Sequence, residues 1–78
     1  MLTLTTAART RLGTRAATYV EMHGTHSTRG RPMVPSTDAA TPGVERTLDR
    51  VYGRATTRDR GEVAYWDVPA SDVVADAE

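Results

Sequence analysis

With 78 residues, ten arginines against ten acidic residues and no cysteine, the chain has room for one small domain spanning residues 1–78. The lack of cysteine excludes a disulfide framework and a thiolate metal site, and no apolar run approaches the roughly 20 residues of a membrane helix. Residues 1–31 carry five arginines against Glu21 alone, whereas residues 32–78 carry five arginines against nine acids. We therefore expect a cytoplasmic protein with no membrane partner, a basic front and an acidic C-terminal part at 61–78.

The first predicted element is a helix over residues 7–23. Thr5 or Thr6 can cap its start, apolar residues recur at helical spacing as far as His23, and Gly24 is a natural end. Residues 25–42 are rich in threonine and hold three prolines, so we predict a loop with at most one helical turn, at residues 36–40.

A central amphipathic helix is predicted from Thr41-Pro42, with threonine as N-cap and proline at the first helical position. It should run to Tyr52 or Arg54. One side of this helix is apolar and faces a core: Val44, Leu48, Val51, Tyr52 and Ala55. The opposite side carries arginine at every fourth position: Arg46, Arg50 and Arg54, with Arg58 at the same spacing beyond them.

Two short strands, at residues 55–58 and 62–68, are predicted to form a β-hairpin around the turn at residues 59–62. Trp66 is expected to pack on the central helix rather than to lie exposed. Pro69 should end the second strand, and Ser71 can cap a short C-terminal helix with Val73, Val74 and Ala77 facing inward. The predicted fold class is therefore α+β.

The arginine row has a cost, because like charges at i,i+4 spacing destabilise a helix by roughly 0.2–0.5 kcal/mol per pair. Arg50 has no carboxylate three or four positions away, and Arg46 has only Asp49. Guanidinium groups without acidic neighbours favour an external anion, and the phosphate backbone of a nucleic acid is the commonest. An alternative interpretation is a solvated arginine face with no partner.

The order of amphipathic helix and β-hairpin over residues 43–70 resembles the second half of a winged helix-turn-helix domain of the MarR, HxlR and ArsR kind. Residues 44–51 are similar to the recognition helix, and residues 58–68 are similar to the wing, although Gly53 comes two residues early. The resemblance implies a small winged-helix-like domain that binds double-stranded DNA as a homodimer. Its implied nucleic-acid-binding residues are Arg46, Thr47, Arg50, Arg54, Arg58 and Arg60, with Thr57 as a secondary contact.

Catalytic, cofactor and metal sites find little support in the sequence. The serines lack a nucleophile-elbow context, and the isolated glycines form no phosphate-cradling loop. His23 and His26, even with Glu21, lack the further ligands that zinc needs. We therefore expect no enzyme activity, no cofactor and no small-molecule substrate.

A second hypothesis comes from the poor supply of core residues: valine and leucine number 12 and isoleucine and phenylalanine are missing. Such a chain suits a small structural or assembly protein of a phage particle or another large complex, which folds against its neighbours. In that hypothesis the arginines contact acidic protein surfaces and the protein is located in the virion.

Overall fold

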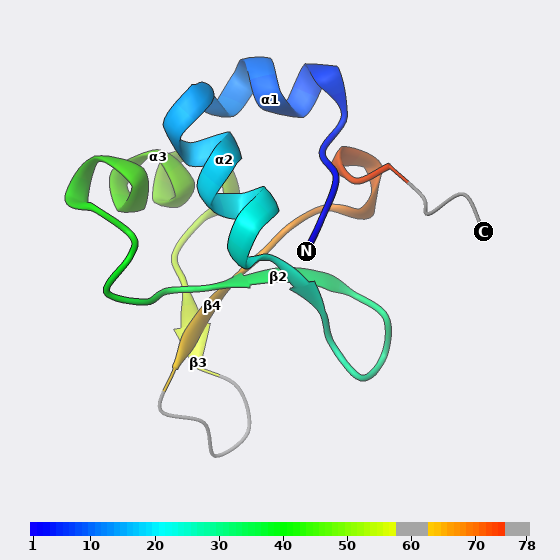
Figure 1. Ribbon diagram of the computed structural model, residues 1–78. Coiled ribbons are helices and arrows are strands. Elements are labelled where there is room, and N and C mark those ends of the chain that lie inside the picture. The colour runs from blue at the N-terminus through cyan, green and yellow to red at the C-terminus, as the bar shows by residue number, and fades with distance from the viewer. Residues whose placement is uncertain (58–62, 75–78) are drawn as a thin grey trace.

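A computed structural model of the chain describes residues 1–57 and 63–74. Within these residues the protein is an α+β domain with three α-helices, a four-stranded antiparallel sheet and one 3₁₀ turn. The helices gather on one side of the sheet (Figure 1). In chain order the elements are α1 (Thr6–Leu12), α2 (Thr14–His23), β1 (Thr25–His26), β2 (Pro32–Pro35), α3 (Pro42–Tyr52), β3 (Thr56–Thr57), β4 (Ala64–Asp67) and η1 (Ala70–Asp72).

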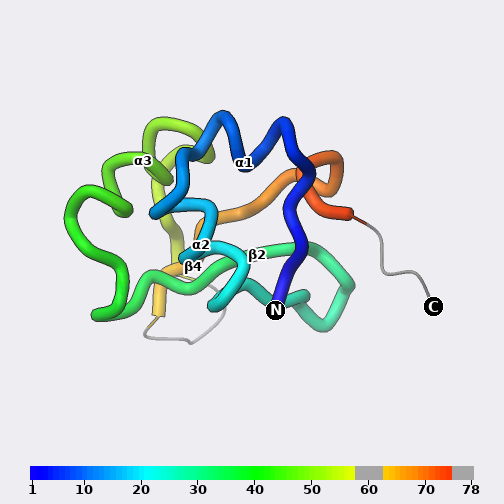
Figure 2. The backbone as a smooth tube through the Cα atoms, turned by 45° about the horizontal axis from the view of Figure 1, so that its top comes forward, coloured from blue at the N-terminus to red at the C-terminus, as the bar shows by residue number. Residues whose placement is uncertain are grey.

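The predicted helix over residues 7–23 is in fact two helices that meet at Gly13. Thr5 caps α1 by accepting a hydrogen bond from the Ala8 amide at 3.1 Å, as its position suggested. Gly13 then adopts a φ of 85°, a left-handed value that stops α1 and redirects the chain. As a result α1 runs across the top of the molecule and α2 descends to the sheet (Figures 1 and 2).

The predicted loop at 25–42 instead contains the strands β1 and β2. The sheet has the order β1-β2-β4-β3, and β2 pairs with β4 so that Val34 faces Trp66. Prolines occupy both ends of β2, where a missing amide hydrogen is tolerated: β1 is too short to reach Pro35. The stretch between β2 and α3 forms one turn, closed by a 2.9 Å bond from the Ala40 amide to the Thr37 carbonyl.

The core lies between the helices and the sheet, and it is built around Trp66, Leu48, Val34, Val20 and Leu4. The apolar side of α3 faces it as predicted, since Val44 and Leu48 are buried and the following apolar residues pack against the core. Trp66 is 2% exposed, which confirms that it packs inside. Its indole nitrogen donates to the Asp49 Oδ1 of α3 at 2.8 Å, so helix and strand are joined by a polar contact as well.

The predicted C-terminal helix capped by Ser71 is replaced by the 3₁₀ turn η1, which begins earlier, at Ala70. Val73 then forms an antiparallel bridge with Leu4, and Val74 is 45% exposed instead of facing inward; Ala77 lies outside the described residues. Asp72 is buried and accepts hydrogen bonds from Arg11 and from the Tyr52 hydroxyl. The two ends of the described chain therefore hold each other (Figure 1).

Candidate nucleic-acid interface

The helix that carries the predicted arginine row has well-defined ends. Thr41 caps α3, with Pro42 in the first turn, and Gly53 ends it with a φ of 84°. Arg46 and Arg50 therefore lie on α3, and both are exposed. Arg54 is also exposed but lies beyond the glycine, so it does not continue the helical row as predicted.

The hairpin predicted at residues 55–68 corresponds to the antiparallel pair β3 and β4, and both strands are shorter than predicted. Thr57 lies exposed on β3, opposite Ala64 of β4. Arg58 and Arg60, the two cations predicted for this hairpin, lie outside the described residues. The structure thus places two of the four predicted arginine-row residues on one helix face.

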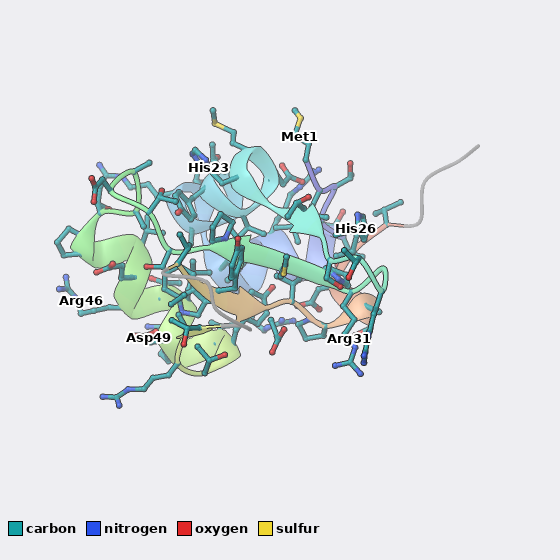
Figure 3. The ribbon with its side chains drawn as sticks, turned by 90° about the horizontal axis from the view of Figure 1, so that it is seen from below. Met1, His23, His26, Arg31, Arg46 and Asp49 are labelled. Carbon is teal, nitrogen blue, oxygen red and sulfur yellow. The ribbon has the colours of Figure 1, made fainter. Side chains whose placement is uncertain are left out.

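The two arginines on α3 have no acidic partner within the described part of the chain. The ion pairs there join Arg9 to Glu21 and Arg11 to Asp72, and neither involves an arginine of α3. Asp49, the one carboxylate at helical spacing from Arg46, accepts the Trp66 indole N–H instead. Figure 3 shows Arg46 projecting away from the body of the molecule. Arg46 and Arg50 are consequently exposed guanidiniums without a direct ion pair in the described residues, on a helix that also carries the charged side chains of Glu45 and Asp49.

Thr47 is less suited to a phosphate contact than the sequence suggested. Its hydroxyl donates to the Gly43 carbonyl at 3.0 Å, one turn earlier in the same helix. Because a hydroxyl has a single hydrogen, Thr47 cannot donate to a phosphate without giving up this bond.

A hollow of about 500 Å³ separates the junction of α1 and α2 from the first turn of α3. Arg46 lines it from α3 and Arg15 lines it from α2. Arg15 was not among the predicted site residues, because nothing in the local sequence distinguishes it from any other exposed helix residue. Only the turn at Gly13 and the packing of α2 on α3 bring it to the same hollow as Arg46.

His23 and Glu21, two of the three side chains considered for a metal, contact other groups of the protein. The rings of His23 and Tyr19 lie 4.6 Å apart, and Glu21 accepts the Leu4 amide at 2.8 Å and the Arg9 guanidinium at 2.9 Å. These two donors, the amide first, hold the pKa of Glu21 below its ordinary value. Among the described residues, no three histidine, aspartate or glutamate side chains gather as metal ligands would.

In comparisons with known proteins, no family model, no curated protein and no solved structure matches the chain. Over the part of the chain that is described, none of the helices has the length and apolar character to cross a membrane.

Proposed function

We propose that the protein binds double-stranded DNA through the outer face of α3 and the β3–β4 hairpin, as a small winged-helix-like regulator. The observation that carries this proposal is the pair Arg46 and Arg50 on α3. Both are exposed, both lack an acidic partner among the described residues, and the nearest candidate, Asp49, is bound to Trp66.

The chemistry of this face favours phosphate and base edges as its ligands. Guanidinium groups form paired hydrogen bonds with phosphate oxygens and with the major-groove edge of guanine. Two guanidiniums one helical turn apart also repel each other until an anion lies between or beside them. A polyanion relieves this repulsion along the whole face, and the contacts can be sequence-specific or architectural.

In this proposal α3 has the role of the recognition helix and the β3–β4 hairpin that of the wing. The hydrogen bond between Trp66 and Asp49 joins β4 to α3, which supports treating the helix and the hairpin as one rigid DNA-contacting unit. Arg54, Arg58 and Arg60 would contribute backbone contacts from the hairpin side. A homodimer completes the proposal, because one module of this size rarely gives enough specific affinity by itself.

The test is the binding of fluorescent duplexes, measured by anisotropy from about 50 to about 200 mM salt. Each phosphate contact should contribute about −0.9 to the slope of log K against log salt. Arg50→Ala should weaken binding, whereas Arg29→Ala should do so far less. Arg29 is a matched control, because it is exposed between β1 and β2. The turn that joins these two strands lies away from α3 (Figure 1). Absence of binding at the lowest salt contradicts the proposal.

A small assembly protein is the second candidate, and two exposed methionines favour it. Met1 is 85% and Met22 63% exposed. The Leu2 amide donates to the Glu21 carbonyl at 3.1 Å, so each methionine is the sequence neighbour of a residue in this backbone contact. Exposed flexible thioethers suit a protein contact. Light scattering distinguishes the two: self-association lost in Met22→Ser, without duplex binding, would favour assembly.

A further inference from the structure

The hollow between α2 and α3 brings together two arginines that are far apart in the sequence. Arg15 reaches it because Gly13, with its left-handed φ, ends α1 and starts α2 beside α3. Arg46 reaches it from the second turn of α3. We infer that this hollow binds one phosphate group of the DNA backbone, held by Arg15 and Arg46 together; the inference rests on the function proposed above.

The electrostatics of the hollow point to an anion. Two guanidiniums from different helices share it, and none of its described lining residues is a carboxylate. Arg9 and Arg11 show that this fold pairs arginines with acids elsewhere, whereas neither Arg15 nor Arg46 has an ion pair within residues 1–57 and 63–74. Two cations at one hollow without a counter-charge repel each other, and a bound anion relieves this repulsion.

The shape of the hollow suits a phosphate group on a chain. It is open rather than enclosed, so a phosphate can enter while the backbone continues past it on both sides. Besides the arginines, its lining combines threonines and glycines with the apolar Leu12, Ala16 and Val44. An added Cβ at Gly43 would meet no atom within 4 Å, so the main chain there is accessible to a ligand.

This assignment divides the roles of the two arginines on α3. A phosphate contact positions a protein on the duplex and carries no base information. Arg46, tied to Arg15 by a shared phosphate, becomes a positioning residue for register on the backbone. Arg50, one turn further along α3 and outside the hollow's lining, is left as the residue that meets base edges.

The experiment compares the native chain with Arg15→Ala, Arg46→Ala, the double variant and the control Arg29→Ala. Duplex binding is measured over a salt series on two unrelated sequences. We expect each of the two hollow variants to lose about tenfold in affinity on both sequences, as for a charge-assisted hydrogen bond. If one phosphate is shared, the remaining arginine still neutralises it in each single variant, so the salt slope changes little there and falls by about 0.9 only in the double variant.

Each other outcome overturns the inference in a recognisable way. A salt slope that falls by about 0.9 in each single variant shows two separate phosphates. An Arg15→Ala variant that binds like Arg29→Ala shows that DNA does not enter the hollow. Both outcomes leave the proposed function standing. A native chain that binds no duplex removes the proposed function and this inference together. Inorganic phosphate, added at constant ionic strength, should not displace the duplex; displacement identifies free phosphate as the ligand instead.

Discussion

Asp49 links the stability of the domain to the charge of its proposed interface, and the two effects of removing it have opposite signs. Asp49→Ala leaves the Trp66 indole N–H, on a residue only 2% exposed, without its acceptor. A hydrogen bond to a charged group contributes about 1.5–3 kcal/mol, so we take about 2 kcal/mol as the expected loss. For a domain of this size that lowers the melting temperature by roughly 8–16 °C.

The same substitution removes a negative charge from the helix that carries Arg46 and Arg50. At a distance of about 8 Å in a water-like dielectric, one charge is worth roughly 0.5 kcal/mol, or about a twofold gain in affinity for a phosphate. Asp49→Ala should therefore be less stable and bind duplex DNA slightly more tightly. Asp49→Asn separates the two effects, since it keeps an oxygen acceptor for the indole but loses the charge.

Thermal unfolding by circular dichroism and duplex anisotropy at low salt measure the two effects on the same samples. We expect Asp49→Asn to unfold closer to the native temperature than Asp49→Ala does, with the same gain in affinity. An Asp49→Ala variant with native melting would refute the reasoning on the indole bond. Stability lost as expected, but with unchanged affinity in both variants, would show that DNA does not approach this face of α3.

Three further predictions concern the fold. Leu48→Ala should cost about 2–5 kcal/mol in unfolding by urea, because this side chain is fully buried; a smaller loss would mean that α3 packs less tightly than described. Glu21 has a lowered pKa in the folded state, so its contribution to the free energy of unfolding is complete above the unfolded pKa and is lost as pH falls through the folded pKa. Glu21→Gln should therefore be less stable than the native chain at pH 7 and equally stable in strong acid. A difference in stability that is constant at all pH values would contradict this. Gly24→Ala should be strongly destabilising in thermal melts, because its Cβ would lie 2.4 Å from the Val20 carbonyl oxygen; native-like melting would show that the backbone shifts freely there.

The elements with local signals were predictable from the sequence. Thr41, Pro42 and Gly53 mark the ends of α3, and the apolar spacing of Val44 and Leu48 identifies its inner face. These signals act within one helix and need no knowledge of distant residues.

The features that depend on distant partners were not predictable in the same way. The strand β2 carries prolines at both ends, and it is a strand because Val34 pairs with Trp66 of β4, far along the chain. A glycine inside a helical pattern is compatible with a continuous helix, so the break at Gly13 shows itself only in its left-handed φ. The hollow shared by Arg15 and Arg46 depends on that break, so it could not be predicted from the sequence either.

The bridge between the two ends of the described chain has a consequence for mechanical load. Thr3 accepts from the Val74 amide at 2.7 Å, Leu4 is bridged to Val73, and Thr5 donates to the Asp72 carbonyl at 2.9 Å. Because the two segments are antiparallel, a force that pulls the ends apart loads these contacts one after another. We therefore expect these contacts to break one at a time at low force, starting at Thr3, before the sheet is disrupted.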